Sequence, residues 1–415
     1  MSDTTKEFEK EVEVSGHLID SLVLTQIFNK IMDLKGEFEV LDFKIGKSKT
    51  DSSYIKLLVK GSTKDHLHTM LDHLHEYGAG PVSLGDVQVQ VSPKDMVVPE
   101  TFYSTTHHPT EVYHEGRWLL VDNPMMDKLI VIKKDRAICQ TIREIKKGDL
   151  IVVGTEGIRV KPPERPRAGL DVFEFMSSKA STEKPIPSIA KRIAEDFVAI
   201  KKSGGKIAVV AGPAVVHTGA ADSLANLIKG GWIDVLLAGN ALAVHDVENA
   251  LYGTSLGIDV SSATSTVQGH RNHMAAINEI FRAGSLAAAV KNGRLSSGIM
   301  YECIENNVPY VLAGSLRDDG PIPDVITDVV EAQIMHKDYL KNVDMVVMLC
   351  TMLHSIAVGN MIPSTVKVVA VDINPSTVTK LLDRGTGQAL GVVSDVGAFL
   401  PLLVGYLDEL SPSVS

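Results

Sequence analysis

The stretch VDMVVMLCTMLHSIAVGNM, Val343–Met361, decides the fold together with two that follow it, VKVVAVDINPSTVTKLLDRG, Val366–Gly385, and ALGVVSDV, Ala389–Val396. Each stretch opens on a short apolar run rich in β-branched residues and then passes through a small or polar cluster. A helical pattern follows each cluster. Consecutive βα units of a parallel sheet have this form. The sequence therefore predicts buried strands that alternate with helices.

The middle unit also carries a possible ligand contact. Its strand ends at Asp372, where Asn374 is suited to cap the next helix and Pro375 to begin it. An acidic side chain at the carboxyl end of a buried strand often binds the hydroxyl groups of a ribose. Capping of a turn is the alternative interpretation of Asp372.

Length and composition limit the possible classes of protein. The 415 residues exceed one ordinary core, so we expect two or three domains. A net charge of −10 argues against nucleic acid or an anionic membrane as the main partner. The cysteines Cys139, Cys303 and Cys350 are scattered, without disulfide or zinc spacing. No apolar run is long enough to span a bilayer. We therefore expect a cytoplasmic protein without a bound metal.

Four regions follow one another along the chain. We expect a ferredoxin-like α+β module over residues 1–91, a β-rich region over 92–168, a linker and helix over 169–205, and an α/β domain over 206–415. In the first region, a last strand at Val87–Val91 would complete a βαββαβ order. The helix Lys64–Tyr77 carries four histidines, which we interpret as a solvated face rather than a metal site.

The large domain is predicted to be a doubly wound parallel sheet. Its six predicted strands are Ile207–Ala211, Ile233–Ala238, Pro309–Ala313, Val343–Leu349, Val366–Val371 and Leu390–Val393. Ligands of such sheets bind beyond the carboxyl ends of the strands, where this chain places glycines and acidic residues. GxGxxG is absent, so a different set of loops would hold a dinucleotide. The residues expected to bind such a dinucleotide are Asn240, Ala241, Asp319, Thr351, Met352, Leu353, His354, Asp372, Asp395 and Val396.

Four long runs carry a family resemblance. They are Gln268–Asn278, Val308–Asp328, Thr351–Ser364 and Val371–Gly385. They resemble the archaeal-type ornithine cyclodeaminases, a family similar to proteins labelled lysine-oxoglutarate reductase/saccharopine dehydrogenase-like and to the cyclodeaminase half of the cyanobacterial arginine dihydrolase–ornithine cyclodeaminases. The resemblance implies an NAD-binding domain similar to that of deoxyhypusine synthase. It also implies an ammonia-lyase that converts L-ornithine to L-proline with tightly held NAD. We further expect a homo-oligomer.

The implied chemistry sets requirements for the site. The α-carbon is oxidised to an imine, the δ-amine attacks that carbon, ammonia leaves and a hydride returns. Such a site needs a cationic clamp for the carboxylate, a base and exclusion of water. The candidate bases are His217, His245 and His270, whereas His354 is expected beside the cofactor. The candidate clamps are Arg271, Arg294 and Arg317, and Asp246 or Glu248 could hold the distal ammonium.

His245, Asp246 and Arg271 are the catalytic residues that we select. Each also has a structural interpretation as a helix cap, a surface ion pair or a core histidine. Two other functions stay open at this point. One is net NAD-dependent dehydrogenation of an amino acid or a saccharopine-like adduct, and the other is amino-acid sensing through the N-terminal module.

Overall fold

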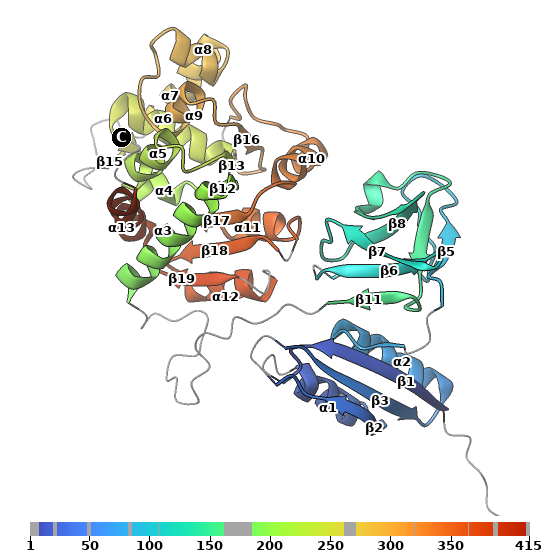
Figure 1. Cartoon of the computed structure of the whole chain (residues 1–415). Coiled ribbons are helices and arrows are strands. Elements are labelled where there is room, and N and C mark those ends of the chain that lie inside the picture. The colour runs from blue at the N-terminus through green and yellow to red at the C-terminus, as the bar shows by residue number, and fades with distance from the viewer. Residues whose placement is uncertain are drawn as a thin grey trace, which may run out of the picture. The chain divides into compact units, whose positions relative to one another are not determined.

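The computed structural model describes residues 8–19, 23–47, 51–81, 85–106, 108–161, 185–260, 271–318, 320–363, 365–384 and 389–411. The chain divides into two compact units, Met1–Glu174 and Phe175–Ser415 (Figure 1). Among the described helices, none is long and apolar enough to cross a membrane. The region boundaries expected at residues 91, 168 and 205 stay predictions.

The N-terminal unit begins with a four-stranded antiparallel sheet covered by two helices. Its elements are β1 (Phe8–Gly16), α1 (Val23–Asp33), β2 (Glu37–Lys44), β3 (Ser53–Gly61), α2 (Lys64–Glu76) and β4 (Gly80–Pro81). The strand order is β2-β3-β1-β4, the ferredoxin-like arrangement expected from the sequence. Helix α2 begins where the Thr63 side chain accepts a hydrogen bond from His66 N. Apolar side chains such as Ile27, Leu57 and Met70 form the core.

Two expectations about this module were wrong. The strand predicted at Val87–Val91 is β5 (Gln88–Val91), and it pairs with the next sheet rather than with β1. The two-residue β4 takes the place beside β1 that was expected for this strand. The sequence did not reveal β4, because a strand so short shows no alternation of apolar and polar residues. The α2 face was expected to be solvated, but the His75 side chain is buried against Tyr103.

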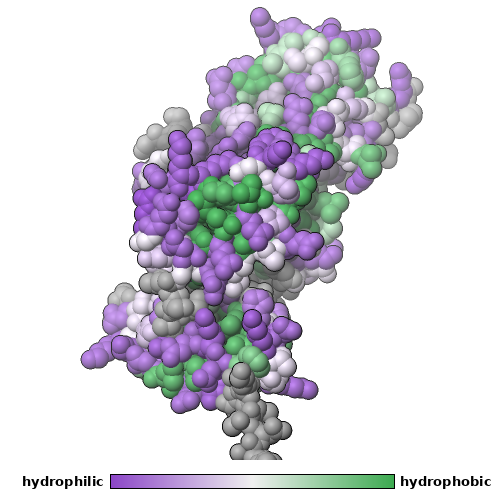
Figure 2. Space-filling view, turned by 90° about the vertical axis from the view of Figure 1, so that its right-hand side faces the viewer, coloured by the Kyte–Doolittle hydropathy of each residue, from purple (hydrophilic) through white to green (hydrophobic). Residues whose placement is uncertain are grey.

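A seven-stranded sheet fills the rest of this unit. Its other strands are β6 (Thr110–His114), β7 (Arg117–Asp122), β8 (Leu129–Lys133), β9 (Arg136–Gln140), β10 (Leu150–Val153) and β11 (Ile158–Val160), in the order β11-β6-β7-β9-β8-β10-β5. Figure 2 shows a patch of apolar residues on the face that is turned toward the viewer. The exposed apolar side chains near β5 in sequence are Val91, Met96, Val97 and Phe102.

The C-terminal unit is built on a six-stranded sheet in which all neighbours are parallel. The strands are β12 (Ile207–Ala211), β13 (Val235–Gly239), β16 (Tyr310–Ala313), β17 (Met345–Leu349), β18 (Lys367–Asp372) and β19 (Leu390–Val393). Their order, β16-β13-β12-β17-β18-β19, corresponds to 3-2-1-4-5-6 in chain order. The doubly wound sheet is confirmed. The order reverses between β12 and β17, where such sheets bind ligands.

Helices cover both faces of this sheet (Figure 1). Val209 and its alternate neighbours pack under α3 (Ile186–Lys202), α4 (Ala214–His217), α5 (Ala221–Lys229), α6 (Asn240–Tyr252), α7 (Asn272–Ala283), α8 (Leu286–Lys291), α9 (Ile299–Glu305) and α13 (Val396–Leu410). Side chains on the opposite face of the sheet, such as Val210, pack against α10 (Val329–Leu340), α11 (Met352–Gly359) and α12 (Pro375–Arg384). A small ribbon of β14 (Thr254–Ser255) and β15 (Ile258–Asp259) follows α6.

Candidate functional site

Four ionisable side chains meet beyond the carboxyl ends of β12 and β13. His217 ends α4, which follows β12, whereas His245 and Glu248 lie on α6, which follows β13. Residues three apart share a helix face, so His245 and Glu248 point the same way. His273 comes from the first turn of α7. We call His217, His245, Glu248 and His273 the histidine–glutamate cluster.

Glu248 is the centre of the cluster and is fully buried. Its Oε2 lies 3.3 Å from Nδ1 of both His245 and His273. Its Oε1 accepts hydrogen bonds from Thr254 Oγ1 at 2.9 Å and Gly257 N at 3.0 Å. Burial raises the pKa of Glu248, but the hydrogen bonds from these four groups outweigh burial and hold the pKa well below its usual range. Glu248 is therefore ionised at neutral pH.

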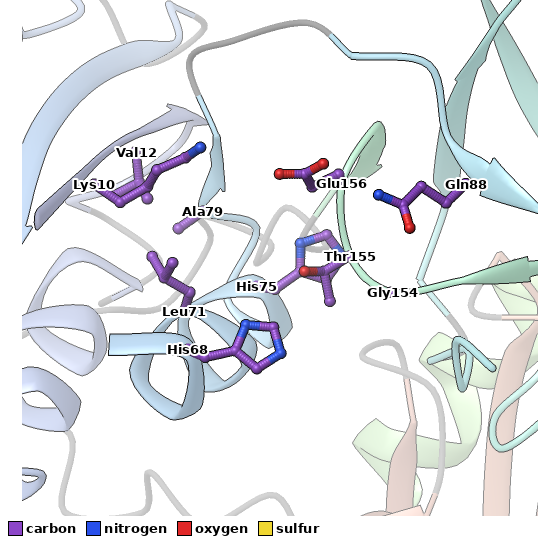
Figure 3. Close-up of a pocket in the computed structure, with 10 residues that line it drawn as sticks. All are labelled: Lys10, Val12, His68, Leu71, His75, Ala79, Gln88, Gly154, Thr155 and Glu156. Carbon is purple, nitrogen blue, oxygen red and sulfur yellow. The ribbon is translucent and has the colours of Figure 1, made fainter. Parts of the chain in front are cut away.

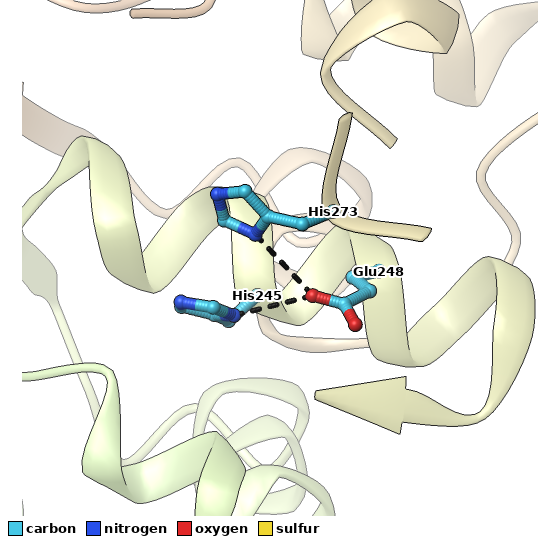
Figure 4. A group of neighbouring side chains, drawn as sticks. All are labelled: His245, Glu248 and His273. Atoms are coloured by element: carbon cyan, nitrogen blue, oxygen red, sulfur yellow. Dashed lines mark hydrogen bonds and ion pairs between the residues drawn. The ribbon is translucent and has the colours of Figure 1, made fainter. Parts of the chain in front are cut away.

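The rings of the cluster are oriented by this carboxylate. Because a carboxylate only accepts hydrogen bonds, Nδ1 of His245 and of His273 carries the proton when each bonds Glu248. Both rings extend from Glu248 toward the same side, with Nε2 farther from the carboxylate (Figure 4). His217 packs on His245 with ring centroids 4.5 Å apart, and its Nδ1 lies 2.6 Å from Ser255 Oγ. Whenever the rings of His245 and His273 are neutral, their Nε2 atoms can therefore accept a proton.

The cluster also contains residue types that bind metal ions. One ligand atom from each of His245, Glu248 and His273 lies within 4.8 Å of the others, and histidine with carboxylate is a donor set that zinc accepts. Both oxygens of Glu248 already accept hydrogen bonds. The bonds to Oε2 come from histidine nitrogens that could themselves bind a metal, so only the bonds from Thr254 and Gly257 to Oε1 are independent of that choice.

Asp246 occupies a different environment from its neighbours on α6. Its two carboxylate oxygens each accept a backbone hydrogen bond of 2.8 Å, from Ile299 N and Met300 N at the start of α9. It is completely buried, and burial raises its pKa to about 6 despite these bonds. This geometry favours the interpretation of Asp246 as a helix cap.

The candidate arginines lie at the surface. Arg271 precedes α7 and is exposed, as are Arg294 and Arg317. Nη1 of Arg294 is 3.8 Å from a carboxylate oxygen of Glu279. His270 and Asp319 lie outside the described residues.

The switch point between β12 and β17 brings two backbone segments into close contact. Gly212 N donates a hydrogen bond of 2.9 Å to Leu349 O, and a side chain at Gly212 would collide with Cys350 O. Thr351 then occupies the N-cap position of α11, where its side chain makes no capping hydrogen bond. At the same edge Leu353 and Ile373 are 75% and 69% exposed. Exposed apolar side chains beside a helix N-terminus suit a ligand that has both flat rings and phosphates, so the residues present fit a dinucleotide.

His354 on α11 is paired with His336 on α10. Their Nε2 atoms are 2.7 Å apart, and His336 Nδ1 lies 2.7 Å from the carbonyl oxygen of Ala332. A carbonyl cannot donate, so His336 Nδ1 carries the proton. Burial lowers the pKa of His336 and lowers that of His354 to about 4, so both rings are neutral. His354 Nε2 therefore donates to His336, and His354 Nδ1 is left as an acceptor.

The other residues expected to bind NAD take several positions at this edge. Asn240 begins α6 but is buried. Its side-chain Nδ2 donates a hydrogen bond to Gly320 O, and its Oδ1 accepts one from Ile322 N. Ala241 is partly exposed beside it. Asp372 ends β18 and its Oδ1 accepts from Asn374 N at 2.8 Å. Asp395 caps α13 through a bond from Gly397 N, while Val396 is buried.

Two histidines of these networks were not selected from the sequence. His273 lies within the run Gln268–Asn278, but only the packing of α7 against α6 brings it to Glu248. His336 gave no sequence signal, because its partner His354 is 18 residues away on another helix.

The parallel sheet in the order 3-2-1-4-5-6 defines a Rossmann-fold protein with a candidate site at the carboxyl edge of its sheet. Residues 191–403 match the family described as arginine dihydrolase ArgZ-like, C-terminal, Rossmann fold, and residues 109–190 match the first region of the same C-terminal part. Residues 9–108 match the LOR/SDH bifunctional enzyme conserved region.

Named relatives cover nearly the whole chain. It is 55% identical over 410 residues to the ornithine cyclodeaminase of Methanocaldococcus jannaschii, with 97% of each protein covered. The apo structure of ArgZ, an arginine dihydrolase from the ornithine–ammonia cycle in cyanobacteria, matches 99% of this chain and 60% of its own at 38% identity and a TM-score of 0.85. The ternary complex of AgrE with ornithine and NAD⁺ has the same coverage and identity with a TM-score of 0.54. The chain belongs to the ornithine cyclodeaminase family.

Proposed function

We propose that this protein is an NAD-dependent ornithine cyclodeaminase that converts L-ornithine to L-proline and ammonia. The observation that carries the proposal is the buried histidine–glutamate cluster at the carboxyl edge of a 3-2-1-4-5-6 sheet. Support comes from the 55% identity to the archaeal ornithine cyclodeaminase and from the complex of AgrE with ornithine and NAD⁺.

The cofactor would lie across the switch point. NAD⁺, when bound, supplies the acceptor for a hydride and later the hydride that is returned. Thr351–His354 at the start of α11 would present backbone N–H groups, and Asp372 would bind a ribose through the oxygen that the turn leaves unused. Asn240 would act indirectly, by holding the loop at Ile322 in place through its side-chain amide. The small side chain of Ala241 would allow the cofactor to approach the backbone closely.

The cluster would handle the protons of the substrate. An amine must be neutral before hydride leaves its α-carbon, because the nitrogen lone pair becomes part of the C=N bond. His245 and His273, with Nε2 directed away from Glu248, would accept protons from the two substrate amines. The ionised Glu248 would stabilise each imidazolium that forms. Arg271 stays the candidate clamp for the carboxylate.

Two further properties belong to this proposal. The reaction consumes a free amino acid and serves proline biosynthesis, so we expect a cytoplasmic enzyme. We also expect a homo-oligomer, since the exposed apolar side chains near β5 are the kind of surface that subunits bury.

An isotope experiment tests the reaction. L-Ornithine deuterated at Cα is supplied with unlabelled NAD⁺, and proline, ammonia and NADH are quantified. We expect deuterium at Cα of proline, one ammonia for each proline, and no accumulation of NADH. Stoichiometric NADH without proline would instead support the dehydrogenase. Ornithine binding without any turnover would support a sensor.

A further inference from the structure

A cavity of about 320 Å³ lies inside the N-terminal unit. One wall comes from β1 and α2 of the ferredoxin-like module, and the other comes from β5 and the turn between β10 and β11 (Figure 3). His75 Nε2 lies 3.1 Å from Tyr103 Oη, a buried contact that joins α2 to the segment before β6. The two walls are therefore connected beside the cavity. Its volume is within the range of small-molecule sites.

Lys10 is placed unusually for a surface lysine. Side chains alternate along a strand, so Lys10 shares a face of β1 with Val12 and Val14, which are buried in the module core. The opposite face pairs its charges locally, as between Lys56 and Glu11 at 2.7 Å. Among the described residues, no ion pair is found for Lys10. Lys10 is half-buried and lines the cavity, so an anionic group bound there would give its amine a partner that the described part of the chain does not provide.

Glu156 brings the opposite charge to the same cavity. It lies in the turn between β10 and β11, close to Gly154 and Thr155. The Lys10 amine and the Glu156 carboxylate extend into the gap from opposite sides (Figure 3). They form no ion pair with each other, and within the described part of the chain Glu156 has no other cationic partner. The space between them suits one small molecule that carries both charges.

The remaining lining decides the class of molecule. Val12, Leu71 and Ala79 form an apolar wall, while Gln88 adds an amide. His68 and His75 also line the cavity, and burial keeps His75 neutral at pH 7. The carboxylate of Glu156 would repel a phosphate or a second carboxylate, and the apolar wall favours an aliphatic side chain. We propose that this cavity binds a free α-amino acid, with its carboxylate at Lys10, its ammonium at Glu156 and an aliphatic side chain against Val12 and Leu71.

The bound amino acid would be an effector and not the reacting substrate. The cavity lies in the N-terminal unit, whereas the histidine–glutamate cluster and the switch point belong to the C-terminal unit. A molecule that bridges the two sheets of the N-terminal unit would stabilise one arrangement of their walls. L-Proline, an aliphatic zwitterion, is the first probe.

Calorimetric titration of the full chain with L-proline tests the proposal. The background is Glu248→Gln, which alters the cluster and leaves the cavity intact. Binding should persist in Glu248→Gln protein and weaken at least tenfold when Lys10→Met or Glu156→Gln is added. Glu9→Gln, on the exposed face of β1, is the matched control and should leave binding unchanged.

Two analogues separate a zwitterion site from a simpler one. Pyrrolidine lacks the carboxylate and N-acetylproline lacks the ammonium, so both should fail to bind. Equal binding of proline by the Lys10→Met, Glu156→Gln and parent proteins would overturn the site, as would the absence of proline binding to the parent. Tight binding of N-acetylproline would overturn the role of Glu156. None of these outcomes depends on turnover of ornithine, so failure here is distinguishable from failure of the proposed enzyme.

Discussion

Asp246 and Glu248 stand two residues apart on α6 and project from different sides of the helix. Both are completely buried, yet their partners differ in kind. Asp246 bonds two backbone N–H groups of α9, whereas Glu248 bonds two histidines, a threonine and the Gly257 amide. The same residue class at nearly the same depth therefore serves a helix terminus in one case and a proton network in the other.

This contrast gives a paired prediction. Glu248→Gln removes the charge that stabilises the imidazolium forms of His245 and His273, so kcat should fall by about 100-fold or more. Asp246→Asn places an amide donor against backbone donors, so the free energy of unfolding should fall by about 1–3 kcal/mol while kcat of the folded enzyme stays within a few-fold. Ammonia release and urea unfolding of both variants provide the measurements. The reverse pattern would return Asp246 to the catalytic set.

The strands of the C-terminal sheet could be predicted because each is a continuous apolar run that is followed by a small or acidic residue. Ile207–Ala211, which Gly212 follows, is one example. The strands β4 and β11 have only two and three residues, so neither contains a run of this kind. Strands this short depend on the sheet that they join and not on their own pattern.

The site could be predicted in part for the same reason. Thr351 and Asp395 follow strands and Asp372 ends one, so the parallel topology alone puts them at one edge. The contacts of His273 and His336 depend on how helices distant in sequence pack, and no spacing reveals them. The capping of α9 by Asp246 was hidden in the same way.

The pairing of α10 with α11 gives a second prediction. His336 fixes the tautomer of His354, leaving Nδ1 as an acceptor beside the switch point. His336→Phe removes the acceptor for His354 Nε2, so NAD⁺ should bind about tenfold more weakly through loss of one oriented hydrogen bond. His336→Gln can still accept that bond and should retain most of the affinity. Calorimetry measures binding, and ¹⁵N spectra of labelled histidine report whether His354 Nδ1 is unprotonated. A protonated Nδ1 in the parent protein would contradict the assignment.

The two units of the chain can be followed separately, because each contains one of the two tryptophans, Trp118 and Trp232. Each unit also buries a neutral histidine. In the N-terminal unit burial lowers the pKa of His75 to about 4, although a bond to the Ala79 backbone opposes the shift. In the C-terminal unit burial likewise lowers the pKa of His217, His336 and His354. Acid should therefore weaken both units, and the variant Trp232→Phe leaves Trp118 to report on the first.

The pH dependence of the N-terminal unit follows from the sign of this shift. The pKa of His75 is lower in the folded state than the 6.5 of an unperturbed histidine, so the unfolded state binds the extra proton first. Its contribution to stability is complete above pH 6.5 and is lost as the pH falls toward 4. Between pH 7 and pH 5 the free energy of unfolding should fall by about 2 kcal/mol, since one pKa unit corresponds to about 1.4 kcal/mol. Urea unfolding of Trp232→Phe protein, followed by Trp118 fluorescence, measures it. Glu111 also has a lowered pKa, but it titrates below this window. The control adds His75→Gln, because glutamine is neutral at every pH. The free energy of unfolding of this variant should change less between pH 7 and pH 5, and an unchanged slope would show that His75 is not the source of the pH dependence.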